Sequence, residues 1–142
     1  MEIRNCSQLN LENKYGNVKI ESLDRGNLEI KYSEATIGSV KESLDVSELA
    51  YSSLNIKELS ANFKSLTVDA RYGNLNVNIP SKASFKVAAE SMKYGNHNVS
   101  GFNVTNKSTE DKVNHYYEIN GGNKGRIYFD GNNYSNISVK AL

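Results

Sequence analysis

Few side chains in this chain have the chemistry of a catalytic or metal site. There is one cysteine, Cys6, and there are two histidines, His97 and His115. A single cysteine cannot form an internal disulfide or a cysteine-rich zinc site, and no second ligand lies at metal-like spacing from His115. The sequence contains no Ser-His-Asp arrangement and no phosphate-binding loop. We therefore expect no catalytic residue, no metal site and no cofactor.

Three carboxylates recur along the chain at Asp24, Asp45 and Asp69. A glycosidase needs two carboxylates about 5 to 9.5 Å apart, so aligned acids would indicate a polysaccharide-active enzyme. Only Asp45 lies inside an alternating apolar pair, and we do not expect the three to align. The sequence therefore favours a protein that is not an enzyme.

Tyrosine recurs at a nearly regular interval. Six of the nine tyrosines are followed directly by Gly or Ser, and the positions of these six differ successively by 17, 19, 21, 22 and 40. Tyr116 lies inside the longest gap, so seven tyrosines form a series with a period of about 20 residues, as in a repeat protein. The series is Tyr15, Tyr32, Tyr51, Tyr72, Tyr94, Tyr116 and Tyr134.

The residues after each tyrosine alternate in polarity. The third and fifth residues are apolar in twelve of fourteen cases, the exceptions being His97 and Gly121, and the residue between them is always polar. This pattern is typical of a strand with one buried face. The same alternation turns the Gly or Ser after each tyrosine inward. Looser apolar pairs between the copies, such as Leu28/Ile30 and Leu66/Val68, predict a second strand in each repeat.

These repeats predict the fold. Residues 1–142 are expected to form an all-β, single-domain β-solenoid, similar to a parallel β-helix, with about seven coils of about 20 residues each. Successive hairpins in a sandwich would explain the alternation but not the regular recurrence of tyrosine. Equivalent residues would stack, and Asn17, Asn74 and Asn96 would serve the corners through side-chain hydrogen bonds or a left-handed backbone. The polar residues 105–114 are expected to form a surface loop.

The tyrosine series also suggests a binding surface. The rings would form either a platform on which sugar rings stack or a partly buried structural column, and we favour the column. Basic residues precede four tyrosines and would align into a stripe, which either contacts an anionic glycan or lipid head group or, as we favour, is a solvated face that prevents aggregation. The candidate ligand surface comprises Tyr15, Tyr32, Tyr51, Tyr72, Tyr94, Lys14, Lys31, Arg71 and Lys93. For His97 we expect a ring hydrogen-bonded to backbone rather than a ligand-binding residue.

Charge and hydropathy argue against a nucleic-acid-binding protein and against a membrane-spanning helix. The 17 Lys and Arg nearly balance the 16 Asp and Glu, which argues against a nucleic-acid partner. No apolar run approaches the roughly 18 residues of a membrane-spanning helix, and the N-terminal residues 1–14 lack the apolar core of a signal peptide.

Three motifs resemble a known family: Tyr-Gly-Asn-Val-Lys-Ile at 15–20, Arg-Tyr-Gly-Asn-Leu-Asn-Val at 71–77 and Lys-Tyr-Gly-Asn-His-Asn-Val at 93–99. Together with residues 63–74 they are similar to the adhesin-type β-strand-repeat family of exported bacterial proteins, frequent in Bacteroidetes. The resemblance covers roughly residues 9–140. It implies a β-solenoid exported to the periplasm or cell surface, with no established chemistry. Members usually carry an export signal and further coils, which implies that this chain is a fragment of a longer exported protein.

The sequence therefore predicts a non-catalytic scaffold or adhesion-type binding module. Its partner would be a glycan, an envelope component or another protein. The alternative is a structural spacer, or a self-assembly unit that forms a homo-oligomer through the ends of the solenoid.

Overall fold

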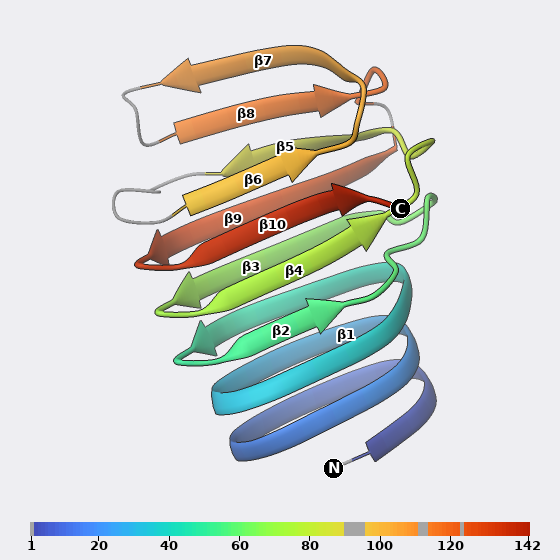
Figure 1. The fold of residues 1–142 in the computed structure, drawn as a ribbon. Helices are drawn as coiled ribbons and strands as arrows, with labels where there is room; N and C mark the ends of the chain where they lie inside the picture. The colour runs from blue at the N-terminus through green and yellow to red at the C-terminus, as the bar shows by residue number, and fades with distance from the viewer. Residues whose placement is uncertain (1, 90–95, 111–113, 123) are drawn as a thin grey trace.

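The computed structural model describes residues 2–89, 96–110, 114–122 and 124–142, and it is all-β. All ten strands belong to one curled sheet (Figure 1). The strands are β1 (Glu2–Ala50), β2 (Ser53–Ile56), β3 (Ser65–Arg71), β4 (Asn74–Ile79), β5 (Phe85–Ala89), β6 (Asn96–Ser100), β7 (Val104–Glu110), β8 (Asn114–Ile119), β9 (Gly125–Asn133) and β10 (Asn136–Ala141).

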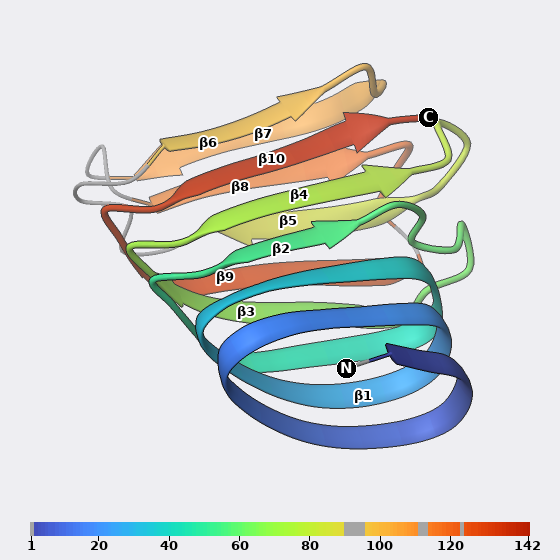
Figure 2. The same cartoon turned by 60° about the horizontal axis from the view of Figure 1, so that its bottom comes forward.

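The long strand β1 winds around the N-terminal end of the molecule in successive turns (Figure 2). Side chains on neighbouring turns bind each other: the Ser22 hydroxyl donates to Asn5 Oδ1 at 2.8 Å, and Asn13 Nδ2 donates to Ser33 Oγ at 3.0 Å. The partners are 17 and 20 residues apart, so each turn is about as long as the tyrosine spacing. The curvature of β1 brings two flanks of the sheet face to face.

The core fills the space between these flanks, and it contains the apolar residues that the alternation predicts. Parallel pairing sets Ala35 opposite Leu54 and Leu54 opposite Leu75, and all three are buried. The other flank contributes Phe63, Phe85 and Phe129, which are among the largest fully buried side chains. The predicted inward face is therefore confirmed in these strands.

The order of the strands differs from a stack of seven coils in chain order. Across the sheet the order is β6-β10-β4-β2-β1-β3-β9-β5-β8-β7. The last two strands of the chain lie inside the sheet, since β9 pairs with β3 and β5, and β10 pairs with β4 and β6. Gly125 begins β9 where a Cβ atom would come within 2.7 Å of the Phe63 ring, so only glycine fits this close approach.

The surface loop expected at residues 105–114 is also wrong, because the described residues of this segment belong to strands. Residues 105–110 belong to β7 and Asn114 begins β8, while residues 111–113 lie outside the described part of the chain. β7 pairs antiparallel with β8, and β8 pairs antiparallel with β5. β7 is an edge strand, and polar side chains on an edge strand discourage pairing with other chains. The edge position therefore explains why β7 is a strand although its polar composition is typical of a loop.

We predict that the C-terminal strands β9 and β10 are essential to the fold because each has a neighbouring strand on both sides. Replacing the buried Phe129 of β9 by alanine should lower the free energy of unfolding by about 3 to 5 kcal/mol. Val104→Ala, on the exposed edge strand β7, should change it by less than about 1 kcal/mol. Urea denaturation of both variants measures the difference, and equal small losses would contradict the strand order.

Candidate functional site

Five tyrosines form a stack of rings along one edge of the molecule, which we call the tyrosine ladder. It comprises Tyr15, Tyr32, Tyr51, Tyr72 and Tyr134, whose successive ring centroids are 5.0 to 5.1 Å apart. The planes of neighbouring rings differ by 1° to 16°. The predicted column therefore exists, with Tyr134 following Tyr72 because β10 lies beside β4. Tyr116 lies in the middle of β8 opposite Ala88, so its place in the series was wrong. Tyr94 is outside the described residues.

The backbone of the ladder is left-handed, with φ between 49° and 63° at each of the five tyrosines. Such a conformation costs an L-residue with a side chain roughly 1 to 2 kcal/mol. Each stacked pair of rings contributes about 0.5 to 1.5 kcal/mol, so two neighbours approximately offset the strain. Of the two roles expected for the corner asparagines, Asn74 and Asn96 take the first, since they bind through their side chains and their backbones are not left-handed. Asn96 Nδ2 donates to Asn136 Oδ1 at 3.3 Å, and Asn136 Nδ2 donates to Asn74 Oδ1 at 3.1 Å.

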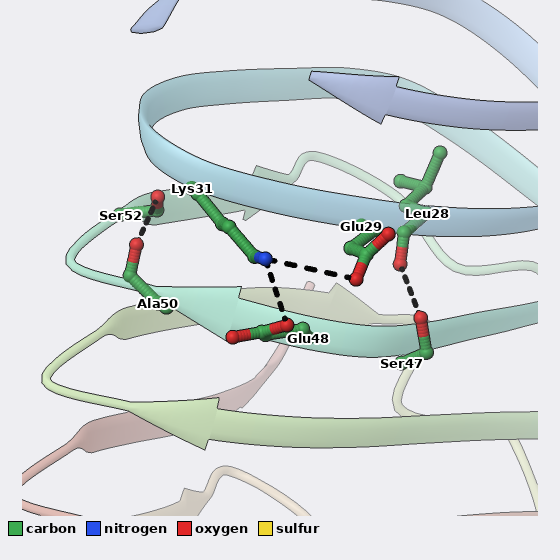
Figure 3. Close-up of polar contacts among 7 residues, drawn as sticks. All are labelled: Leu28, Glu29, Lys31, Ser47, Glu48, Ala50 and Ser52. Atoms are coloured by element: carbon green, nitrogen blue, oxygen red, sulfur yellow. Dashed lines mark hydrogen bonds and ion pairs between the residues drawn. The ribbon is translucent and has the colours of Figure 1, made fainter. Parts of the chain in front are cut away.

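The residue after the tyrosine is buried, as predicted, at four of the five ladder corners, whereas Gly16 after Tyr15 is exposed. Ser33, Ser52 and Ser135 are buried, and their hydroxyls form hydrogen bonds with backbone groups of the corners. The Ser33 N–H donates to Ser52 Oγ at 3.1 Å. The Ser52 hydroxyl donates to the Ala50 carbonyl at 2.7 Å, as Figure 3 shows. These bonds hold the corner closed beneath the rings.

The rings themselves are half exposed, with 48 to 68% of each tyrosine accessible to solvent. An open groove of about 790 Å³ follows the ladder. Besides ladder tyrosines, its lining is polar and includes Asn17, Glu34, Ser53 and Asn74. The ladder is thus a partly buried column whose tyrosines are also accessible to solvent.

The basic residues do not form a continuous stripe beside the ladder. Arg71 lies between Ala50 and Asn133 on the neighbouring strands, so uncharged residues separate it from Lys31. Lys31 Nζ contacts Glu48 at 3.4 Å and Glu29 at 3.9 Å (Figure 3). Lys14 Nζ lies 5.4 Å from the centroid of its neighbouring ring, Tyr15. Lys93 lies outside the described residues.

A second cluster forms where β6 faces β8. His97 points inward from β6, and its Nε2 lies 2.7 Å from the Tyr117 hydroxyl, so its partner is a side chain rather than the expected backbone. The His115 ring lies 4.3 Å from that of His97. Burial, followed by the positive charges of His115 and Lys107, lowers the pKa of His97, and burial raises the pKa of Tyr117. The tyrosine periodicity did not predict this cluster because β8 contributes two of its members, and the antiparallel pairing of β8 was not expected.

The carboxylates are not in register. Asp45 pairs across the sheet with Thr67, whereas Asp69 pairs with Asp130. Asp24 lies 3.9 Å from Lys41 Nζ. Within the described residues, no three His, Cys, Asp or Glu side chains are grouped as metal ligands. The same residues include no helix long and apolar enough to cross a membrane.

Comparisons with protein-family models, curated proteins and solved structures found no match for this chain.

We predict that stacking and backbone strain can be separated at Tyr51, which has a ring on each side. Tyr51→Ala removes two stacking contacts and keeps the strain, so it should lower the free energy of unfolding by about 1 to 3 kcal/mol. Tyr51→Gly removes the same contacts but relieves the strain, and should be more stable than the alanine variant. Tyr15→Ala, at the end of the described ladder, should cost less than Tyr51→Ala. Thermal and urea unfolding test this, and equal stability of the alanine and glycine variants at Tyr51 would refute the strain.

We also predict a loss of stability in mild acid. The pKa of His97 is lowered in the folded state, so below about pH 6.5 the unfolded chain binds more protons than the folded one. The free energy of unfolding should therefore fall as the pH drops through 6.5 toward the lowered value. His97→Gln should reduce this dependence, as measured by urea denaturation between about pH 5 and pH 8. An unchanged slope in that variant would show that other groups cause the effect.

Proposed function

We propose that this chain is a non-catalytic β-solenoid scaffold whose tyrosine ladder binds an extended glycan. The observation that carries the proposal is a row of five half-exposed tyrosines at a constant interval of 5.0 to 5.1 Å. A regular row of this kind suits a ligand that is itself a linear polymer.

The parallel register supports the solenoid. β2, β4, β10 and β6 are neighbours in that order, and equivalent residues of each repeat face one another: Ser53, Asn74, Asn136 and Asn96. On the other flank β3, β9 and β5 follow the same parallel order. We infer a short solenoid in which the last coil lies between two earlier ones.

Strain favours a role for the tyrosines beyond stability. Glycine would adopt the left-handed corner without penalty, yet each of the five described corners uses tyrosine. Strained residues gather at functional sites when the surrounding structure holds them in place. Stacking offsets the strain but gives no net reason to prefer tyrosine over an unstrained corner.

The geometry indicates how a glycan would bind. Neighbouring rings cover each other's faces, so a sugar ring cannot enter between them. Tyr32, Tyr51 and Tyr72 line the groove and would bind a ligand through their hydroxyls and ring edges. Glu34, Ser53 and Asn74 line the groove beside them. We therefore propose hydrogen bonding along the ladder rather than stacking of sugars on its faces. The resemblance to exported repeat proteins supports a location in the periplasm or at the cell surface.

At the end formed by β7, the alternative proposal, self-assembly of copies of this chain through the ends of the solenoid, has less support than glycan binding. This edge strand is polar, and the antiparallel pair β7–β8 interrupts the parallel stacking. Such an edge discourages addition of another chain.

The glycan proposal predicts that hydroxyl groups, not rings, determine affinity. The triple variant Tyr32→Phe, Tyr51→Phe and Tyr72→Phe keeps the stack and removes three hydroxyls. If each forms a hydrogen bond of about 0.5 to 1.5 kcal/mol, affinity should fall roughly 10- to 2,000-fold with unchanged stability. A glycan array would identify the ligand, and titration calorimetry would compare the variant with the native chain and with Tyr128→Phe, a control outside the ladder.

Two results would overturn the proposal: the absence of any glycan ligand on the array, or equal affinity of the triple variant. Size-exclusion chromatography over a range of concentrations tests the alternative, since a particle that grows with concentration would favour self-assembly.

A further inference from the structure

A pocket of about 340 Å³ lies on the outer face of the sheet, and no ladder tyrosine lines it. It spans β7, β8, β5 and β9, which are neighbours in the sheet. The register across these strands forms a row in which Ser108 faces Tyr116, Tyr116 faces Ala88, and Ala88 faces Tyr128. All four residues line the pocket.

The row places a small residue between two large ones. Tyr116 and Tyr128 are two strands apart, so their backbones are separated by about 9.6 Å, and the residue between them in the row is Ala88, with only a methyl group. A ring held between two others needs about 7 to 8 Å, which is two contacts of 3.5 to 4.0 Å. We call the space above Ala88 the tyrosine slot. It differs from the ladder, where rings one strand apart leave no room for a guest.

The next row on the same face of these strands, two residues along each strand, is charged. Asn106 faces Glu118, Glu118 faces Lys86, and Lys86 faces Arg126. Lys86 Nζ and Glu118 form a long ion pair at 4.0 Å, and both side chains are partly exposed. Arg126 adds a second positive charge, so two basic residues accompany one acidic residue in this row. An arginine guanidinium is well suited to bind a carboxylate through two hydrogen bonds.

We propose that the tyrosine slot binds a six-membered ring that carries a carboxylate. The ring lies over Ala88 between Tyr116 and Tyr128, and the carboxylate contacts Arg126 and Lys86. The volume is at the lower end of the range for ligand pockets, which suits a single ring rather than a polymer. A uronic acid and an aromatic acid share this chemistry. The site is separate from the ladder and does not depend on the function proposed for it.

The test uses two acids on the full chain, methyl glucuronide and 4-hydroxybenzoate, each beside its neutral counterpart, methyl glucoside or 4-hydroxybenzamide. Amide shifts of Ala88 and Tyr128 in NMR titrations report on the site. We expect at least one acid to shift them and to bind more tightly than its neutral counterpart. The acid that binds identifies the source, sugar or aromatic.

Four variants complete the test. Ala88→Leu fills the slot and Tyr128→Thr removes one wall, and each should weaken binding at least about tenfold. Thr67→Leu adds the same side chain on the other side of Tyr128 in the same row, and should leave affinity within about twofold. Arg126→Gln should weaken the acid roughly ten- to a hundredfold and leave the neutral compound unaffected.

Failure of both acids to shift Ala88, or undiminished binding in both slot variants, would overturn the proposal. Full affinity of Arg126→Gln for the acid would overturn the assignment of the carboxylate. The triple phenylalanine variant of the ladder should bind the acid normally, so a failure of the ladder proposal is distinguishable from a failure of this one.

Discussion

Parallel pairing that returns to register at each tyrosine corner is the constraint on which the rest of this structure depends. The turns of the chain differ in length, because the positions of the first four tyrosines differ successively by 17, 19 and 21, yet the tyrosines still meet ring to ring. The irregularities in pairing between Val46 and Leu49, and between Asp69 and Arg71, accommodate residues just before a corner. The corner therefore stays in register while the segments between corners vary.

The register makes the ladder possible and also limits what it can do. A spacing of one strand brings rings into contact, so stacking energy of about 0.5 to 1.5 kcal/mol per pair is available to offset a left-handed backbone of roughly 1 to 2 kcal/mol. The balance is close to zero for an interior tyrosine. Beneath the rings, the buried hydroxyls of Ser33 and Ser52 form hydrogen bonds with backbone groups of the corners. The arrangement exposes the tyrosines to solvent while the apolar side chains of the core stay buried.

Periodicity predicted which side chains face inward, because the alternation depends only on the geometry of a strand. It could not predict which strands are neighbours, since β10 has the same inward pattern whether it follows β4 or β6 in space. Polarity was misleading at β7, where an edge strand and a loop have the same composition. Tyr116 fitted the spacing of the series by coincidence, and its antiparallel partners exclude it from the ladder. The cluster of His97 and Tyr117 was missed for the same reason.

Strand spacing gives the same residue type two different surroundings in this sheet. Tyrosines on adjacent strands cover each other's faces and remain accessible to solvent. Tyr116 and Tyr128 are two strands apart, and the residue between them in the row is Ala88 rather than a third ring. Burying a ligand ring in that space removes apolar area from water, whereas the ladder offers mainly polar groups. A neutral, hydroxyl-rich polymer therefore suits the ladder, and a compact ring with a negative charge suits the slot beside Arg126.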